Sequence, residues 1–520
     1  MAPVSAVTPM HPADAARKPA EWTVIRGGRL ITPGQPRPQP ADLLIRGDTV
    51  HEVGAPGLPA PDGARVIDAT ARLLQPGLIN AHTHSHGSLA RGMGDRWTLE
   101  LLLTAGPWIN GNRSHDDKRL TTLIGASEML LKGCTACYDL SLELPLPTPE
   151  GMAAVADAYA QAGMRAVLAP MVADLSFFEA IPGLLDALPP PLRAQAERLR
   201  LAPGATTLQA LTSIVSGWRH DRDRVRLAIA PTIPHHCTDG FLRGCRDLAH
   251  GHGLGLHSHV AESKVQALTG LRTYGCTQTA HLDRLGLIGP DFTMAHGIWL
   301  DDDDMRLLGE RGASVAHNPG SNMRLGSGLA DMRQMLASGV NVGIGTDGSS
   351  SSDNQNMYEA MRLASFVSKV RGPDWQRWVT TGEVLHAATE GSARALGFGG
   401  QVGRIAPGYK ADVVFLDTRH ITMIPLIDAA NSLVHAEDGG AVESVMVGGC
   451  LVVANRRLLH VDLDQLAREA ENAVDRLQRM NQAQHALYQA LEPLVGSFCP
   501  ALARQPYHVH RYGACDYAPA

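Results

Sequence analysis

The spacing of hydrophobic and polar positions changes along the chain and divides it into distinct parts. After a leader rich in Ala and Pro over residues 1–20, which we expect to be flexible, short runs of alternating apolar and polar residues lie between turn residues over 21–72. Alternation with a period of two is typical of strands that bury one face. The same texture returns over 405–460. Because neither half has enough strands to close a core alone, we predict that 21–72 and 405–460 form one composite β-sandwich domain.

The central part, 73–404, alternates strand-length apolar runs with amphipathic stretches of helix length. This pattern is typical of βα units around a parallel sheet, and eight units in series predict a barrel. Residues 461–520 begin with apolar residues at helical spacing. The predicted fold class is therefore α/β, a (β/α)8 TIM-type barrel with a discontinuous β-sandwich domain and a C-terminal helical extension. The predicted barrel strands are Leu78–His82, Cys134–Leu140, Arg165–Met171, Val225–Pro231, Gly253–His259, Phe292–His296, Ala313–His317 and Val340–Asp347.

Composition narrows the classes of protein to consider. Of the 520 residues, 44% are hydrophobic and 19% are charged, which is typical of a soluble globular protein with a large core. The net charge of −6 gives no reason to expect nucleic acid or an anionic membrane as a partner. Eight cysteines without a disulfide-like spacing favour a reducing compartment. With no apolar run of membrane-spanning length, the cytoplasm is the expected location.

Side chains of the kinds that bind metals end five of the eight predicted strands. Residues two apart point to the same side of a strand, so His82 and His84 aim two imidazoles at one point. In a barrel the carboxyl ends of the strands converge on one face, which brings such residues together. We therefore predict a metal site at this face. The residues are His82 and His84 at the first strand, His259 at the fifth, His296 at the sixth, His317 at the seventh and Asp347 at the eighth, with Glu262 three positions after His259.

Several motifs, in chain order and at βα spacing, resemble the amidohydrolase superfamily. The branch is the one that holds cytosine, guanine and adenosine-type deaminases and the triazine hydrolases. The motifs are Pro-Gly-Leu-Ile-Asn-Ala-His-Thr-His over 76–84, His-Ser-His-Val-Ala-Glu over 257–262, Ala-His-Gly over 295–297, Val-Ala-His-Asn-Pro-Gly-Ser-Asn over 315–322 and Gly-Thr-Asp-Gly over 345–348.

The resemblance implies a metal centre and roles for the residues around it. One divalent metal, Zn²⁺ in the first place and Fe²⁺ in some relatives, would be bound by His82, His84, His259 and Asp347. The metal lowers the pKa of its water to about 7 and so supplies hydroxide at neutral pH. Asp347 would also accept the water proton, Glu262 would act as general acid and base, and His296 would hydrogen-bond the hydroxide or the developing oxyanion. The fourth-strand segment 230–237 lacks the Lys that bridges two metals in binuclear members, which favours one metal.

The resemblance also implies a reaction, with alternatives that stay open. We expect a metal-bound hydroxide to cleave a C–N bond, most simply by deaminating an N-heterocycle such as a purine, pyrimidine, pterin or triazine. The alternatives are hydrolysis of an amide, urea, carbamate or halogenated heterocycle at the same site, and a catalytically inactive relative that serves as a scaffold. Thr232 stands where nucleoside deaminases of this branch carry His, which argues against an adenosine-type substrate.

Contacts to the substrate and to a second subunit are expected from position along the chain. The long segment after the first strand is rich in large apolar residues that would close over a flat substrate, and the strand ends supply polar groups. We also expect a homodimer or larger homo-oligomer, with the C-terminal extension packed against a second subunit. The predicted contacts of the small-molecule substrate are Trp97, His235, His236, His317 and Asn318.

Overall fold

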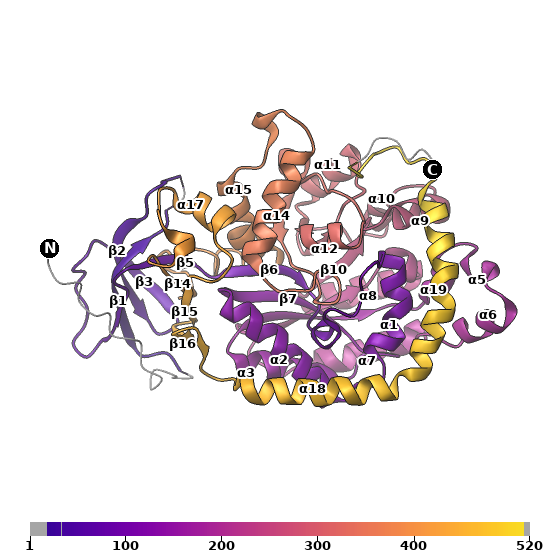
Figure 1. Cartoon of the computed structure of the whole chain (residues 1–520), viewed down its shortest axis with the longest axis horizontal. Coiled ribbons are helices and arrows are strands. Elements are labelled where there is room, and N and C mark those ends of the chain that lie inside the picture. Colours follow the sequence, from indigo (N-terminus) through magenta and orange to yellow (C-terminus); the bar gives the residue numbers. More distant parts are fainter. Residues whose placement is uncertain (1–17, 33, 514–520) are drawn as a thin grey trace.

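The computed structural model describes residues 18–32 and 34–513, so the predicted leader falls almost entirely outside the described residues. Its centre is an eight-stranded parallel sheet in which each strand pairs with the next along the chain (Figure 1). The predicted barrel is thereby confirmed. The strands are β6 (Leu78–Thr83), β7 (Cys134–Leu142), β8 (Arg165–Val172), β9 (Val225–Pro231), β10 (Gly255–Val260), β11 (Phe292–His296), β12 (Ser314–His317) and β13 (Asn341–Ile344).

The first and last strands meet at their carboxyl ends. The amide N–H of Asp347 donates to the carbonyl oxygen of His82 at 2.9 Å, which links the two ends of the sheet. The eighth strand is shorter than predicted, because β13 ends at Ile344 and Asp347 has a φ of 62°. That left-handed conformation costs a non-glycine residue energy and recurs at functional sites. The turn therefore aims Asp347 back over the strand ends.

Helices cover the outside of the barrel, and their ends carry the expected signals. In α8, Thr238 accepts from Phe241 N as the N-cap, and Gly253 ends the helix with a φ of 62°. The helices on the barrel are α1 (Leu99–Asn110), α2 (His115–Leu131), α3 (Pro149–Ala162), α7 (Gly204–Gly217), α8 (Asp239–His252), α9 (Lys264–Tyr274), α10 (Gln278–Arg284), α11 (Asp302–Arg311), α12 (Pro319–Arg324), α13 (Met332–Ala337), α14 (Met357–Val370) and α15 (Thr381–His386).

A separate nine-stranded sheet lies beside the barrel and joins two distant parts of the chain (Figure 1). Strand β5 pairs antiparallel with β14, so Leu74 lies opposite Phe415. A buried ion pair ties this sheet to the barrel, because Arg165 of β8 donates to Asp412 at 3.0 Å. The strands of the sheet are β1 (Trp22–Leu30), β2 (Gln39–Arg46), β3 (Thr49–Gly54), β4 (Arg65–Asp68), β5 (Arg72–Pro76), β14 (Val413–Asp417), β15 (Val442–Val447), β16 (Cys450–Ala454) and β17 (Arg457–Leu458).

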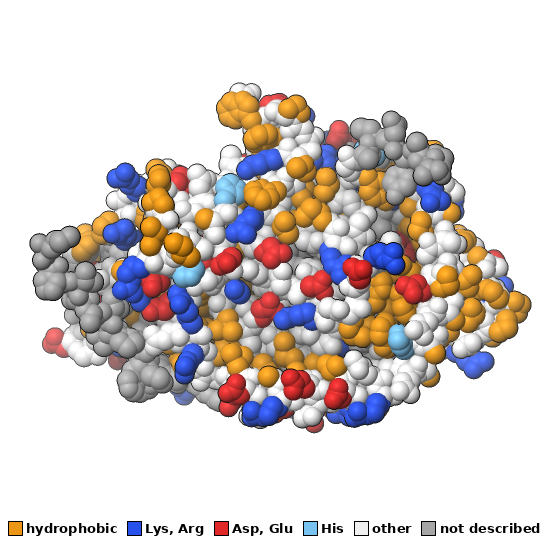
Figure 2. Space-filling view, in the orientation of Figure 1, with side chains coloured by type: hydrophobic (Ala, Val, Ile, Leu, Met, Phe, Trp, Pro, Cys, Tyr) orange, Lys and Arg blue, Asp and Glu red, His pale blue; other side chains and the backbone are white. Residues whose placement is uncertain are grey.

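The C-terminal extension consists of two long helices that run around the barrel, α18 (Leu463–Met480) and α19 (Gln482–Ala503) (Figure 1). The outer side of α18 carries acidic and basic side chains in turn (Figure 2). Helix α19 packs on α1 of its own chain, where Trp97 Nε1 donates to Tyr488 Oη at 2.8 Å. The buried residues of α19 therefore stabilise the fold of a single chain. Packing of the C-terminal extension against a second subunit stays a prediction. No helix in the described part of the chain is long and apolar enough to cross a membrane.

Candidate functional site

Three imidazoles and one carboxylate meet at the carboxyl ends of the barrel strands. The Nε2 atoms of His84 and His259 are 3.1 Å apart. Asp347 Oδ1 lies 3.6 Å from His82 Nε2 and 3.2 Å from His84 Nε2. Four tetrahedral ligands at the bond lengths of Zn²⁺ stand roughly 3.4 Å apart. Two overlapping groups of ligand atoms that could hold a metal ion lie here, His82 with His84 and His259, and His82 with His296 and Asp347. The four predicted ligands all belong to these groups, and their role as ligands stays a prediction.

Main-chain carbonyls hold two of the imidazoles in the form that a metal needs. His84 Nδ1 donates to the carbonyl oxygen of Leu140 at 2.9 Å, and His259 Nδ1 donates to that of Thr232 at 2.8 Å. With the proton on Nδ1, the lone pair of Nε2 is free to bind a cation. Each ring is therefore oriented by the end of a neighbouring strand, and its Nε2 faces the centre of the cluster.

The electrostatics of the cluster also suit a cation. Burial lowers the pKa of His82 to about 3, so its ring is neutral, and both ring nitrogens lack a hydrogen-bond partner among the described residues. Leaving buried polar atoms unsatisfied is costly. Burial opposes ionisation of Asp347, yet the nearby rings of His82, His84 and His296 hold its pKa well below the ordinary value. A neutral imidazole beside an ionised carboxylate is the donor set that a bound metal would satisfy.

Glu262 and His296 form a second pair at the edge of the cluster. Glu262 Oε1 lies 3.6 Å from His296 Nε2, and both side chains are buried. Burial, together with the charges of Asp347 and Glu100, raises the pKa of Glu262 well above its ordinary value. His296 Nδ1 donates to Asn322 Oδ1 at 2.8 Å, while its Nε2 has no partner among the described residues. A carboxyl group with a raised pKa thus faces an imidazole with a lowered pKa, and Nε2 of that imidazole is unpartnered among the described residues.

Some of the residues that contact Asp347, His296 or the segment after Glu262 were not predicted from the sequence. Asn322 lies inside the motif of residues 315–322, so its position was visible but its role was not. Gln355 donates to the carbonyl oxygen of Asp347 at 2.8 Å and accepts from Thr83 at 2.6 Å. No sequence pattern pointed to Gln355. Glu100 accepts from Ser263 Oγ at 2.7 Å and so connects α1 to the residue after Glu262.

The predicted substrate residues lie in different surroundings. His317 is buried with both ring nitrogens unpartnered among the described residues, and Asn318 Nδ2 lies 3.4 Å from His296 Nδ1. His235 Nδ1 accepts from Gln278 Nε2 at 2.9 Å, and Gln278 Oε1 accepts from the N–H of Ala261. Asn318 thus lies beside His296, and His235 is linked through Gln278 to the main chain next to Glu262. A role of His317 in substrate binding stays a prediction.

His236 and Trp97 are engaged by packing. The ring of His236 is buried next to Phe177, with centroids 6.2 Å apart. The indole of Trp97 is buried between α1 and α19, where it contacts Trp108 and Tyr488. A role of these two residues in substrate binding stays a prediction. In Trp97 the polar atom of the ring is already satisfied by Tyr488.

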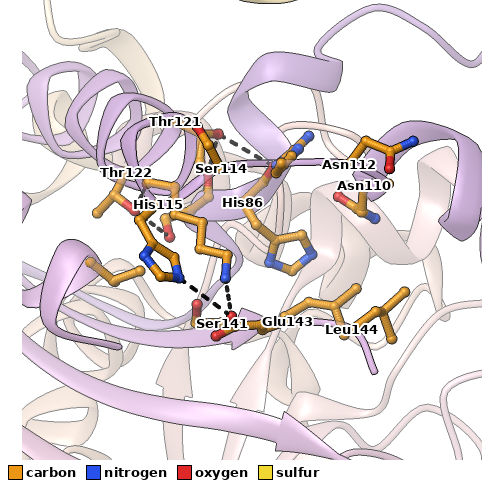
Figure 3. A pocket seen from close by; sticks show the side chains of 16 residues that line it. His86, Asn110, Asn112, Ser114, His115, Thr121, Thr122, Ser141, Glu143 and Leu144 are labelled. Atoms are coloured by element: carbon orange, nitrogen blue, oxygen red, sulfur yellow. Dashed lines mark hydrogen bonds and ion pairs between the residues drawn. The ribbon is translucent and has the colours of Figure 1, made fainter. Parts of the chain in front are cut away.

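A cavity of about 480 Å³ begins directly after the metal-ligand segment. Ser85 and His86, which follow His84, form one of its walls, and the ring of His86 lies 5.2 Å from that of His84. Ser141 and Glu143, at the end of β7, form another (Figure 3). The remaining walls come from the segment between α1 and α2 and from the first turns of α2. Its position at the carboxyl ends of β6 and β7 makes it a candidate substrate cavity.

Comparison with known proteins agrees with this architecture. The family model described as "Amidohydrolase family" matches residues 73–452. A 5-methylthioadenosine/S-adenosylhomocysteine deaminase of Syntrophobacter fumaroxidans is 32% identical over 457 residues, which cover 86% of this chain and 96% of the relative. A 5'-deoxyadenosine deaminase of Methanobrevibacter smithii is 28% identical over 456 residues, which cover 87% of this chain and 98% of the relative.

Solved structures show the same likeness. An adenosine deaminase from Xanthomonas campestris with bound zinc superposes with a TM-score of 0.77 at 26% identity and covers 88% of this chain and 98% of its own. An atrazine chlorohydrolase from Arthrobacter aurescens complexed with zinc superposes with a TM-score of 0.78 at 26% identity and covers 87% of this chain and 100% of its own. Similar folds thus occur in proteins whose structures contain zinc.

Proposed function

The chain belongs to the amidohydrolase family, and from this premise and the geometry of its site we propose that it is a metal-dependent aminohydrolase that removes an amino group from an N-heterocyclic small molecule. The observation that carries the proposal is the convergence of the imidazoles of His82, His84 and His259 and the carboxylate of Asp347 at the carboxyl ends of the barrel strands. The chemistry of these donors supports the proposal of one divalent ion, held by His82, His84, His259 and Asp347. We propose Zn²⁺, which suits such a set, while Fe²⁺ is the alternative.

The reaction needs proton transfers that nearby side chains can perform. A divalent metal bound at this point supplies a Lewis acid that lowers the pKa of water. Asp347, which is ionised, accepts the proton that the attacking water loses. Glu262, whose pKa is raised by burial, donates a proton to the ring nitrogen or to the departing amine. His296 donates or accepts through Nε2 at the oxygen that enters the substrate.

Metal analysis combined with a screen for ammonia release tests the proposal. The screen covers aminated purines, pyrimidines, pterins and triazines, and the names of the relatives bring adenosine-type nucleosides into it in spite of Thr232. We expect about one equivalent of Zn or Fe and ammonia from one class of compound. His259→Ala should lose both, whereas His250→Ala, on the surface of α8, should keep both. Full metal content without ammonia from any compound would refute the deaminase.

A second candidate is hydrolysis of an amide, urea, carbamate or halogenated heterocycle by the same groups. It is favoured by the similarity to the atrazine chlorohydrolase. Chloride or amine release from halogenated and alkylated triazines separates it from deamination. If chloride appears where ammonia does not, the second candidate replaces the first.

We propose the cytoplasm as the location and a homodimer or larger homo-oligomer as the assembly. The first is supported by the seven cysteines of the described residues, all of which are free thiols. The second is supported by exposed apolar side chains, among them Phe366, Val370 and Trp375 near the end of α14. A single-chain mass by light scattering would refute the oligomer.

A further inference from the structure

The cavity beside His84 holds an unbalanced positive charge. Arg113 lines it, and the guanidinium donates only to main-chain carbonyl oxygens, those of His86 and Ile109. Its Nε has no hydrogen-bond partner within the part of the chain that the structure describes. Burial lowers the pKa of Arg113 to about 10, and Asp117 is the one acid that acts against this shift.

Asp117 does not neutralise Arg113. Its carboxylate accepts from the N–H and hydroxyl of Ser114, where it completes the N-terminal cap of α2, and from Arg476 of α18. A partly buried guanidinium without a carboxylate partner is costly, because its desolvation is not offset. Arginine also has the planar set of donors that matches a carboxylate in two-point contact. A carboxylate brought by a ligand would remove the imbalance.

The other charges of the cavity cancel. Lys118 of α2 forms an ion pair with Glu143, which directly follows β7, and both side chains are largely buried. Glu143 also accepts from the N–H and the hydroxyl of Thr148. The carboxylate of Glu143 is thereby saturated with donors and is not free to neutralise Arg113. Apart from the half-exposed His115, the charges of Arg113, Lys118 and Glu143 around the cavity add up to one positive charge, which is that of Arg113.

Uncharged groups complete the lining. Asn110 Oδ1 and His86 Nδ1 are buried and without a partner among the described residues. Ser141 lies near them at the end of β7 (Figure 3). The side chains of Asn110, His86 and Ser141 give the lining polar groups, whereas Arg113 is the charged lining residue without an ion-pair partner among the described residues. The cavity thus combines sites for a heterocycle with one for an anion.

We propose that this cavity binds the carboxylate of the substrate through Arg113, so that the substrate is an N-heterocycle that carries an amino group to be hydrolysed and, at its far end, a carboxylate. The inference rests on the proposed function, because it places the heterocycle between Arg113 and the metal-ligand cluster. His86 is the link, since its ring packs against that of His84 and its carbonyl oxygen accepts from Arg113.

Calorimetric binding to the zinc-loaded protein tests this inference without requiring turnover. Two matched pairs of probes differ in a carboxylate: pterin and pterin-6-carboxylate, and cytosine and 5-carboxycytosine. A third pair is methylthioadenosine and S-adenosylhomocysteine, which differ in a side arm that carries an ammonium group as well as a carboxylate. The variants are Arg113→Met, Arg113→Lys and, as a matched control, Arg119→Met, whose guanidinium donates to Gln161. A charge-assisted hydrogen bond to an anion contributes enough to change affinity about 10- to 100-fold.

We expect one carboxylated probe to bind about 10- to 100-fold more tightly than its neutral partner. Arg113→Met should abolish that preference, Arg113→Lys should keep part of it, and Arg119→Met should keep all of it. If Arg113 only holds the main chain of His86 and Ile109, Arg113→Met will weaken both members of a pair alike and the inference falls. It also falls if no carboxylated probe binds better than its partner. Ammonia release from the same compounds reports separately on the proposed function.

Discussion

Replacing Glu262 by Gln separates proton transfer from every other property of the site. The carboxyl group is 2% exposed, and its Oε2 has no partner among the described residues. Gln has the same shape and still donates a hydrogen bond, but it cannot release a proton. A positioned general acid contributes about 10²- to 10⁴-fold to the rate, or about 3 to 5 kcal/mol of the barrier. We therefore expect kcat of Glu262→Gln to fall by that factor.

Two further readouts distinguish this effect from damage to the fold or to the metal centre. Glu262 is not among the four groups that converge on the proposed metal position, so the metal content should stay the same. The fold raises the pKa of Glu262, so the protein loses stability as the pH rises above the pKa that this residue has in the unfolded chain. Gln does not ionise and therefore removes that loss. The Tm of the variant should be equal to or higher than that of the wild type at neutral pH.

The assay is steady-state ammonia release by metal-loaded protein, with metal content and Tm measured on the same samples. Glu310→Gln, at an exposed position on α11, is the matched control and should leave all three unchanged. A loss of less than tenfold in kcat would refute the role of Glu262 as the proton donor. A loss of metal in Glu262→Gln would instead mean that Glu262 is a ligand, and the assignment of the cluster would have to change.

Three more predictions concern the metal, the pH dependence and the stability of the fold. Removing the metal with a chelator should abolish ammonia release and lower the Tm, and readdition of Zn²⁺ should restore both; activity that survives in metal-free protein would contradict the proposal. Burial raises the pKa of Asp304 to about 7, so the free energy of unfolding should fall as the pH rises from 3.8 towards that value. Urea unfolding of Asp304→Asn should show a smaller fall over the same pH range. Equal slopes for the two proteins would show that Asp304 is not responsible. Asp412→Asn leaves Arg165 as an unpaired buried charge and should lower the free energy of unfolding by about 3 to 5 kcal/mol. A change below about 1 kcal/mol would mean that water or another group replaces the carboxylate.

The amino-acid sequence predicted the barrel and the residues that would meet at its centre, because both depend on local rules. Period-two alternation and apolar runs marked the strands to within a few residues, as in β9, Val225–Pro231, where prediction and structure agree at both ends. Since the carboxyl ends of barrel strands converge, a His or Asp at such an end is expected at the centre whatever the details of packing. The strand ends pointed to His82, His84, His259, His296, His317 and Asp347, and the resemblance to the amidohydrolase superfamily selected His82, His84, His259 and Asp347 among them as the predicted ligands.

The features that only the tertiary structure decided are contacts between side chains far apart in the sequence. Trp97 was expected over the substrate, yet its indole donates to Tyr488, 391 residues away, because α19 packs against α1. Glu100 reaches Ser263 across 163 residues. The charge left over at Arg113 depends equally on distant groups, since Arg476 of α18 engages the nearby Asp117. A local pattern determines where a strand ends and which residue stands there, whereas the partners of each side chain depend on how whole elements pack, and no local pattern contains that information.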